Sequence, residues 1–350
     1  MKTIRDLDIK NKTILVRVDY NVPIKNGKIE SDLRLRASLP TINYLLEHGV
    51  KRIILISHLG RPEGKPSKEL SLSIVTNTLR KLLPNQKISF CPLPDKDATI
   101  KIPEDSKIIL LENLRFNPGE EANDSDFIKN IIDAVNADCY VQDGFAVIHR
   151  AHASTDAIKN HLPVYAGLLL EKEINNLETA TKKPAKPVLL IIGGAKVEDK
   201  QPLIDKFGKL ADQIVVGGKI AADGYKSSNP KIYVAEDFDE DMKGDKLDIG
   251  PLATVKLAEY ITDAKTIIWN GLLGYAEDPA YATASTITAE LIGERQDITS
   301  IICGGDTTGF VETLMEAHPS LKYSLVSTGG GATLEYLIGK ELPGLKAIKK

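Results

Sequence analysis

Four apolar segments in the first half of the chain are each followed by groups that could bind an anion. The segments are TILVRV (13–18), RIILIS (52–57), KIILL (107–111) and DCYVQD (138–143). The first leads to Asp19 and Asn21, with Arg17 just inside it, and the others lead to His58 and Arg61, to Arg115, and to Arg150 and His152. Arginine suits anion binding because its planar guanidinium holds phosphate or carboxylate through two parallel hydrogen bonds. A single arginine on a loop is usually solvated surface. Basic groups near four strand ends, in a chain of net charge −3, instead favour a shared anion site.

Glycine-rich segments take the same place in the second half of the chain. They are GGAKVEDK (193–200), GGK (217–219), NGLLGYAED (270–278), CGGDTTG (303–309) and TGGGATLE (328–335). Glycine between a strand and a helix lets backbone N–H groups approach phosphate oxygens at the positive end of the helix. One Gly-Gly pair could serve close packing alone, whereas five such segments favour a phosphate-rich ligand. Neither GxxxxGK[ST] nor a well-placed GxGxxG occurs, so the P-loop and the usual dinucleotide fingerprint are absent.

Three charged residues in these segments could act on phosphate. Lys196 and Lys200 lie four residues apart at the start of an expected helix, so they share one face. Surface lysines are usually solvated, but Lys196 directly follows Gly-Gly-Ala and is well placed to reach a phosphate. Asp306 could cap a helix that begins at Thr307, or it could bind Mg²⁺ on a nucleotide, directly or through water. Both roles are compatible.

The scaffold that would bring these groups together is an α/β fold. Uninterrupted apolar runs such as VLLII (188–192) are typical of strands covered on both faces, as in a parallel sheet. Amphipathic stretches alternate with these runs, which predicts two mainly parallel sheets of five or six strands, each flanked by helices in a three-layer, Rossmann-like arrangement. One predicted helix covers 40–49, with Pro40 in its first turn, Gly49 at its end and Arg34 just before it. Ligands of such sheets bind at the carboxyl ends of the strands.

Composition limits the possible partners. The chain has 42% hydrophobic and 27% charged residues, a net charge of −3 and a sequence pI of about 6.1, which favours a soluble protein with neither nucleic acid nor membrane as partner. No secretory signal is visible at residues 1–15, and the apolar runs are too short to span a bilayer. Cys91, Cys139 and Cys303 have no spacing of a disulfide framework or zinc site, so we expect a cytoplasmic, reduced protein.

A long amphipathic stretch at 165–187, ending in a Lys/Pro-rich break, is the best candidate for a junction between two domains. A helix inside one domain would look the same. With the junction there, a basic domain for a small anion precedes a glycine-lined domain for a polyphosphate. That pairing predicts phosphoryl transfer between two separately bound substrates, with closure about a hinge to exclude water.

A series of longer motifs runs in order through almost the whole chain. They are VRVDYNVP, SDLRLRASLPTI, SHLGRPEGK, LLENLRFNPGEE, HRAHAST, GGAKVEDK, LDIGP, IIWNGLLG, GGDTTG and STGGGATLEYLIGKELPGL. Together they resemble the phosphoglycerate kinase family. The resemblance implies reversible phosphoryl transfer between 1,3-bisphosphoglycerate and ADP, giving 3-phosphoglycerate and ATP in glycolysis and gluconeogenesis, by in-line transfer after hinge closure. The alternative is a non-catalytic nucleotide- or phosphate-binding descendant of the same fold. A third reading, an NAD-dependent dehydrogenase, would need the missing dinucleotide fingerprint.

The resemblance also implies domains and roles for residues of this chain. The expected domains are a phosphoglycerate-binding domain at 1–165, an interdomain helix at 166–183, a nucleotide-binding domain at 184–336, and a segment at 337–350 that returns to the first domain. The expected phosphoglycerate site consists of Asp19, Asn21, Arg34, His58, Arg61, Arg115, Arg150 and His152. The expected nucleotide site consists of Gly193, Gly194, Lys196, Lys200, Gly217, Gly218, Glu277, Gly304, Gly305, Asp306, Thr307, Gly329, Gly330 and Gly331. Arg34, Lys196 and Lys200 are the expected catalytic residues, Glu277 would hold the ribose, and Asp306 would bind the Mg²⁺ that accompanies ADP or ATP. We expect a monomer.

The chain departs from the family pattern in the second domain. The stretch at 217–248 is short, and it contains Lys219 where a third glycine is usual. Leu272, Ala276 and Cys303 replace a usual proline, phenylalanine and glycine. The preferred nucleotide base therefore stays open, as does the question whether Lys219 contacts phosphate or solvent.

Overall fold

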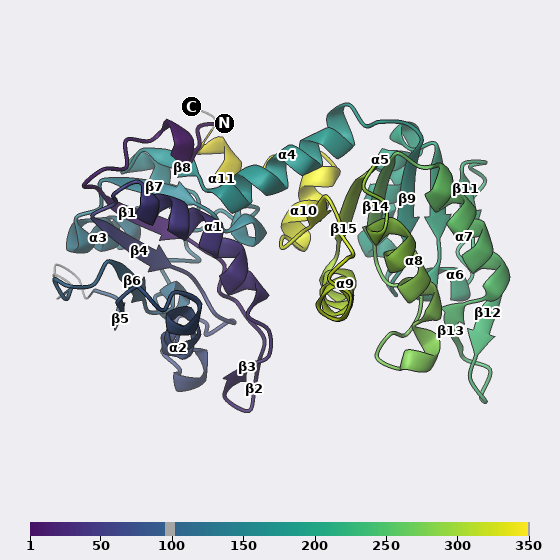
Figure 1. Cartoon of the computed structure of the whole chain (residues 1–350), viewed down its shortest axis with the longest axis horizontal. Coiled ribbons are helices and arrows are strands. Elements are labelled where there is room, and N and C mark those ends of the chain that lie inside the picture. Colours follow the sequence, from purple (N-terminus) through teal and green to yellow (C-terminus); the bar gives the residue numbers. More distant parts are fainter. Residues whose placement is uncertain (95–101, 349–350) are drawn as a thin grey trace. The chain divides into compact units, whose positions relative to one another are not determined.

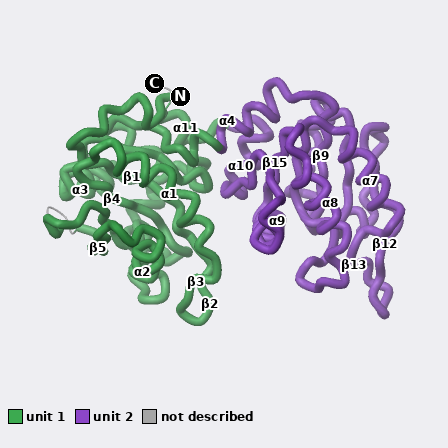
Figure 2. The backbone as a smooth tube through the Cα atoms, in the orientation of Figure 1, with its two compact units in different colours: residues 1–172, 341–350 green, residues 173–340 purple. Residues whose placement is uncertain are grey.

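The structure is a computed structural model that describes residues 1–94 and 102–348 of the chain. The chain divides into two units, unit 1 with residues 1–172 and 341–350 and unit 2 with residues 173–340 (Figure 2). Residues 349–350, the end of the segment predicted at 337–350, lie outside the described residues. The assignment of one unit to phosphoglycerate and the other to nucleotide stays a prediction at this level.

Unit 1 is built on a six-stranded parallel sheet in the order β5-β6-β4-β1-β7-β8 (Figure 1). The strands are β1 Thr13–Arg17, β4 Arg52–Ile56, β5 Ile88–Cys91, β6 Ile108–Leu111, β7 Cys139–Gln142 and β8 Val164–Ala166. Successive side chains of a strand point to opposite faces. In β1, Ile14 and Val16 join an apolar cluster with residues of α1 and α2, while Leu15 between them is equally buried on the other face. The sheet is therefore covered on both sides.

α-Helices and a hairpin accompany the sheet in the described part of unit 1. They are α1 Leu33–Glu47, α2 Ser73–Leu82, α3 Ser125–Val135 and α11 Pro343–Lys346, with the antiparallel pair β2 Ile24–Lys25 and β3 Lys28–Ile29. The local sequence sets the ends of α3. The carboxylate of Asp124 accepts hydrogen bonds from the N–H groups of Asp126 and Phe127, and Asn136 ends the helix in the left-handed conformation.

Unit 2 repeats the plan with the strand order β11-β10-β9-β14-β15-β16, all parallel. Its strands are β9 Val188–Ile192, β10 Gln213–Val216, β11 Ile232–Val234, β14 Thr266–Asn270, β15 Thr299–Cys303 and β16 Leu325–Val326, and a separate hairpin pairs β12 Phe238–Glu240 with β13 Lys246–Ile249. Its helices are α5 Val197–Leu210, α6 Gly218–Ala222, α7 Pro251–Asp263, α8 Thr283–Gly293, α9 Gly305–Ala317 and α10 Gly331–Leu337. Every residue of β9 and β14 is buried, as their apolar sequences require.

Helix α4, Leu168–Lys182, carries the chain from unit 1 into unit 2, since the division falls after Lys172. Leu170, Ile174 and Leu177 are buried at helical spacing. This helix occupies most of the stretch predicted as an interdomain helix at 166–183.

The predicted α/β fold with two helix-flanked parallel sheets is confirmed. The predicted start of the first helix is wrong, because α1 begins at Leu33 and contains Pro40 in its interior. Arg34 therefore lies in the first turn of the helix and not before it. Pro40 is exposed, while Leu35 and Ile42 pack against the sheet, so packing holds the helix together across a residue that normally ends one.

Strand β8 was not predicted. It is three residues long, follows Pro163 and forms the edge of the sheet next to β7. In the sequence, so short a segment looks like the beginning of the helix that follows it. Within the described residues, no helix is both long enough and apolar enough to cross a lipid bilayer.

Candidate functional site

The carboxyl ends of four neighbouring strands of unit 1 form the first candidate site. β6, β4, β1 and β7 are adjacent in the sheet and parallel, so the segments that follow them emerge along one edge. These segments carry the predicted residues Asp19, Asn21, His58, Arg61, Arg115, Arg150 and His152. Arg34 comes to the same edge from the first turn of α1, where its Nη1 forms an ion pair with Asp19 Oδ2.

Hydrogen bonds tie the loops of this edge to one another. The amide N–H of Gly60 donates to Asn21 Oδ1 at 2.9 Å, and Arg115 Nη1 donates to the carbonyl oxygen of Gly60 at 2.8 Å. Gly60 has a φ of +64°, which favours glycine, and a Cβ atom there would lie 2.7 Å from Leu70. The loop SHLGRP thus joins the ends of three strands.

His58 is held as a neutral ring. Arg17 Nη2 lies 3.1 Å from His58 Nδ1, and Asp19 Oδ1 lies 4.0 Å from the same nitrogen. Since a guanidinium only donates, Nδ1 accepts, and the neutral ring carries its proton on Nε2. Burial, and then the charges of the surrounding arginines with Arg17 foremost, lowers the pKa of His58 well below its ordinary value. His58 therefore serves as a hydrogen-bond donor and not as a cation.

His152 is also neutral near pH 7. Burial first, and then the charge of Arg115, lowers the pKa of His152 to about 4. Its Nδ1 lies 4.0 Å from Glu120 Oε1, and Glu120 is fully buried and accepts hydrogen bonds from the N–H and hydroxyl of Ser154. The positive charge of the site comes from its arginines.

The remaining predicted arginines are less constrained. Arg150 Nε donates to His149 Nε2 at 3.3 Å, and its charge contributes to the lowered pKa values of His58 and His152. Arg61 is exposed and forms no hydrogen bond or ion pair with any described residue. The structure therefore places Arg150 with the other predicted site residues. Arg61 is connected to them only because it lies on the same loop as His58.

Two buried charged residues behind the site were not among the predicted site residues. Arg17 is 1% exposed, and its Nε and Nη1 have no hydrogen-bond partner within the described part of the chain. Glu120 is the other. A charged residue as the last residue of the apolar run TILVR is the signal that could have singled out Arg17.

Unit 2 holds a pocket of about 420 Å³ at the carboxyl ends of β10, β9, β14 and β15, which are again adjacent. The predicted nucleotide residues that line it are Gly194, Lys196, Lys200, Glu277, Gly304, Gly305, Asp306 and Thr307. Lys219, for which the sequence left contact with phosphate or with solvent open, also lines the pocket, and so do Lys246 and Tyr275, which were not predicted to do so. Four lysines thus surround a cavity large enough for a small ligand.

Six predicted glycines do not line this pocket. Gly193 and Gly218 lie against the carbonyl oxygen of Leu272, which a Cβ atom would approach to 2.1 and 2.7 Å, so close packing of loops alone demands glycine there. Gly217 similarly packs against Leu273. Gly329, Gly330 and Gly331 precede or begin α10, and their predicted contact with nucleotide stays a prediction.

The first turn of α9 faces the pocket with free donors. Gly305, Asp306 and Thr307 are its first three residues, whose N–H groups have no partner within the helix. The Thr307 hydroxyl accepts a hydrogen bond of 2.8 Å from the N–H of Gly271 and so joins the ends of β14 and β15. The predicted helix cap at Asp306 is wrong. Gly304 occupies the cap position, and Asp306 is the second residue of the helix.

Lys200 reaches into the same pocket and donates to Asn270 Oδ1. Burial lowers the pKa of Lys200, although the nearby Cys303, Asp199 and Asp306 act in the opposite direction. Lys196 precedes α5 and is exposed. Asn270 was not predicted as a site residue, although its place between an apolar strand and a glycine is a usable signal.

The donors around the pocket suit a nucleotide-bound Mg²⁺ better than a metal held by protein alone. In residues 1–94 and 102–348, no group of three or more His, Cys, Asp or Glu side chains could hold a metal ion. Asp306 offers one exposed carboxylate to the pocket. Mg²⁺ is commonly bound through one or two carboxylates plus substrate phosphates, so these residues fit such an ion.

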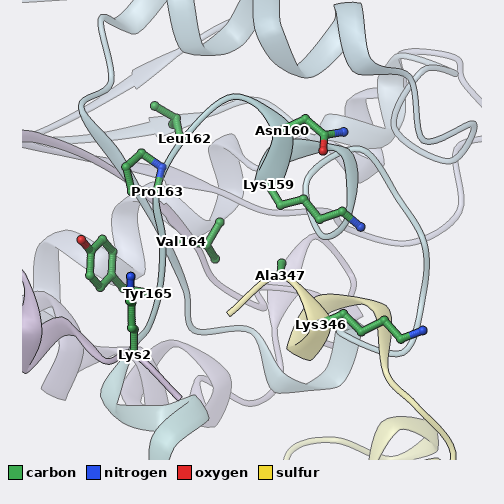
Figure 3. Close-up of a pocket in the computed structure, with 9 residues that line it drawn as sticks. All are labelled: Lys2, Lys159, Asn160, Leu162, Pro163, Val164, Tyr165, Lys346 and Ala347. Carbon is green, nitrogen blue, oxygen red and sulfur yellow. The ribbon is translucent and has the colours of Figure 1, made fainter. Parts of the chain in front are cut away.

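A further pocket, of about 430 Å³, lies in unit 1 but contains none of the predicted residues (Figure 3). Lys2, Lys159 and Lys346 are among its lining residues. Lys159 pairs with Asp156, and Lys346 pairs with Glu341 at 2.5 Å, so two of the three charges are already balanced.

Comparisons with known proteins agree over the whole chain. The family model described as phosphoglycerate kinase matches residues 4–241 and 223–340. Proteins named phosphoglycerate kinase from Moorella thermoacetica and Dictyoglomus turgidum are each 39% identical over 393 aligned residues, which cover 99% of this chain and 98% of the relative. Solved phosphoglycerate kinase structures from Coxiella burnetii and Pyrococcus horikoshii OT3 superpose with TM-scores of 0.81 and 0.84 at 32% and 28% identity, covering 99% and 100% of this chain and 98% of each of those chains.

The same comparisons show that this chain is shorter than its relatives. The alignments span 393 positions, more than the 350 residues of the chain, so the relatives carry segments that this chain lacks. The two parts of the family match overlap at 223–241, within the stretch 217–248.

Proposed function

The chain belongs to the phosphoglycerate kinase family, and on that premise we propose how its residues perform the reaction. The reaction is the reversible transfer of a phosphoryl group between 1,3-bisphosphoglycerate and ADP, which gives 3-phosphoglycerate and ATP. The observation that carries the assignment of roles is the matching arrangement in the two units. The four central strand ends deliver arginines and neutral histidines in unit 1, and lysines with free backbone donors in unit 2.

Unit 1 binds the phosphoglycerate. Arg34, Arg61, Arg115 and Arg150 supply positive charge to the phosphate and carboxylate groups, while His58 donates a neutral hydrogen bond from Nε2. Asp19 orients Arg34 through their ion pair, and Asn21 holds the loop at Gly60. His152 supports this group from its partly buried position near Glu120.

Unit 2 binds the nucleotide. Lys196, Lys200 and the N–H groups at the start of α9 contact the phosphates, and Glu277 holds the ribose. Asp306 binds the Mg²⁺ that accompanies the nucleotide, directly or through water. Mg²⁺ supplies neutralisation of phosphate charge when it is bound.

The chemistry asks for positioning and charge stabilisation more than for proton transfer. The attacking group in the direction of 1,3-bisphosphoglycerate synthesis is the carboxylate of 3-phosphoglycerate, which is already ionised at neutral pH, so no general base is needed. Arg34 and Lys196 stabilise the charge that spreads over the transferring group. Because the two substrates bind to separate units, closure about the hinge has to bring them into line and exclude water.

A non-catalytic descendant of the fold is less well supported. Relatives named as the kinase align over 99% of the chain, and Arg34, Lys196 and Asp306 are all present. A protein that bound both substrates at saturating concentrations without turnover would be such a descendant.

Trapping of the acyl phosphate tests the proposal. With 3-phosphoglycerate, ATP, Mg²⁺ and hydroxylamine, the protein should form a hydroxamate, and Lys196→Ala should reduce its rate by about a hundredfold or more, the scale on which one lost electrostatic contact slows such transfers. Lys206→Ala removes an exposed lysine from α5, the helix that follows Lys196, and should react at the rate of the unaltered protein. Equal rates in the Lys196→Ala and Lys206→Ala proteins would contradict the role of Lys196.

A further inference from the structure

Cys303 is the last residue of β15 and lies beside the end of β14. The parallel register places it opposite Asn270, and both residues are fully buried. Cys303 directly precedes Gly304 and Gly305, which line the nucleotide pocket. It is also one of the positions where the chain departs from the pattern of the family it resembles.

Two hydrogen bonds through Asn270 link Cys303 to Lys200, and a third ties Cys303 to the strand backbone. The Cys303 thiol donates to the carbonyl oxygen of Trp269 at 3.5 Å, and Asn270 Nδ2 donates to Cys303 Sγ at 3.2 Å. Asn270 Oδ1 in turn accepts a hydrogen bond from Lys200 Nζ. The side chains therefore form a short chain from the strand backbone to the ammonium group.

The hydrogen-bonding groups of these residues fix which atom donates and which accepts at each step. A carbonyl oxygen accepts, so the thiol proton is committed to Trp269 and the sulfur is left as an acceptor. Asn270 must then turn its NH₂ toward the sulfur and its oxygen toward Lys200. Lys200 demands the same orientation, because an ammonium group only donates. Both ends of the chain select one orientation of the Asn270 amide.

We propose that Cys303 is a positioning residue that holds Asn270 in the orientation in which its oxygen anchors the ammonium of Lys200 in the nucleotide pocket. The proposal rests on the proposed function, since it takes Lys200 as a contact of the nucleotide phosphates. Lysine has a long and flexible side chain. An oriented acceptor that holds its ammonium group reduces the conformational entropy that the side chain would otherwise lose when the nucleotide binds. Alanine at position 303 leaves the NH₂ of Asn270 without a partner and lets the amide rotate away from Lys200.

Gly304 limits how else this group could arrange itself. A Cβ atom there would lie 3.3 Å from Asn270 Nδ2, so the amide already fits closely under the loop. With a φ of +96°, this position also favours glycine. The amide is thus enclosed by the loop on one side and by the sulfur on the other.

Nucleotide binding with and without Lys200 tests the proposal. Titration of the full-length protein with Mg-ADP should show a dissociation constant raised about three- to tenfold by Cys303→Ala, the range expected for one hydrogen bond. Cys303→Ser keeps a donor and an acceptor and should restore most of the affinity. In a Lys200→Ala background, Cys303→Ala should cause no further loss, because it acts through Lys200. Asn270→Ala, which removes the acceptor directly, should show the same dependence on Lys200.

Cys139→Ala is the matched control, because it removes a buried thiol from the sheet of unit 1. It should leave Mg-ADP binding unchanged and so report any general effect of losing a buried sulfur. The proposal is overturned if Cys303→Ala binds Mg-ADP like the unaltered protein, if it weakens binding equally with and without Lys200, or if serine restores nothing. Lack of turnover in the unaltered protein would count against the proposed function, while the binding cycle would still decide on Cys303.

Discussion

The positive charge of the candidate site in unit 1 lies on arginines, and the histidines among them stay neutral. Burial and neighbouring guanidinium groups disfavour a protonated His58 or His152, with His152 near a pKa of about 4. A guanidinium remains charged under the same conditions because its intrinsic pKa is so high, and even Arg115, whose pKa burial lowers to about 10, is charged at pH 7. The site at this edge of unit 1 therefore keeps the positive charge that an anion would bind across the physiological pH range.

Because His152 is neutral in the folded protein, the stability of the fold depends on pH. His152 has a folded pKa of about 4, below the ordinary value of 6.5, so the unfolded chain binds more protons between these values. Stability from this group is present above pH 6.5 and is lost as the pH falls toward 4. At pH 5 the loss relative to pH 7.5 amounts to about 2 kcal/mol for a shift of this size. Replacement of the histidine by His152→Gln should remove that part of the loss.

Thermal unfolding at pH 7.5 and pH 5.0 measures this effect. The fall in Tm on acidification should be smaller in His152→Gln than in the unaltered protein. His48→Gln alters an exposed histidine on unit 1 and should show the full fall. An identical fall in all three proteins would mean that His152 is protonated in the folded state at pH 5.

Residue types at strand ends are visible in the sequence, but their partners are not. Arg115 and Lys200 could be named because each lies close to an apolar run or a glycine-rich turn, and Arg34 because it belongs to the motif SDLRLRASLPTI just before a predicted helix. The contacts of Arg17 with His58 and of Cys303 with Asn270 depend on which strands are neighbours and in what register, and apolar strands of similar length do not encode that order. The site residues were therefore predictable as a set, whereas the hydrogen bonds that orient them were not.

At the scale of elements, helices α7 and α8 of unit 2 begin with caps supplied from other parts of the chain. The carboxylate of Asp237 accepts hydrogen bonds of 2.8 Å from the N–H groups of Leu252 and Ala253, the second and third residues of α7. Pro251 has no N–H to satisfy, so Asp237 serves both remaining donors of the first three residues. Asp248 serves α8 in the same way through the N–H of Ala284.

Asp237→Ala should lower the free energy of unfolding of unit 2 by about 1–2 kcal/mol, because two N–H groups lose their acceptor and the helix dipole loses its compensating charge. Denaturant unfolding followed by a probe in unit 2 measures the change. Asp263→Ala removes a carboxylate from the other end of α7, where a negative charge opposes the dipole, and should be neutral or slightly stabilising. Destabilisation by both variants to the same extent would show that net charge, and not capping, is responsible.

Helix boundaries were the least predictable part of the fold. Local signals placed a helix start at Pro40, yet α1 begins at Leu33 because Leu35 and Ile42 both find apolar partners on the sheet. Asp306 looked like a cap, but the residue before α9 is Gly304 with a positive φ that local sequence rules do not single out. In both cases packing between elements decided where the helix begins.

At the scale of the whole molecule, unit 1 is completed by residues 341–348, which follow all of unit 2 in the sequence. Leu342, Leu345 and Ile348 are buried there, and the N–H of Gly344 donates to the carbonyl oxygen of Ile148 at 2.9 Å. These contacts make the last segment an integral part of the first unit.

Leu342→Ala should therefore destabilise unit 1 by about 2–4 kcal/mol, the usual cost of removing a buried leucine side chain. Amide hydrogen exchange should quicken in β1 and β7 of unit 1, while β9 and β14 of unit 2 keep their protection. Lys346→Ala alters an exposed side chain of the same segment and should leave both units unchanged. Loss of protection mainly in β9 and β14 would contradict the assignment of this segment to unit 1.

The split of unit 1 along the chain also has a consequence for its synthesis. A ribosome releases the six strands of the first sheet early, but α11 emerges only after residues 173–340 have been translated. Throughout that interval unit 1 lacks the contacts that Gly344 of α11 makes with Ile148. Unit 2 is continuous from residue 173 to 340 and does not wait in this way, so we expect the half of the protein that is made first to reach its final form last.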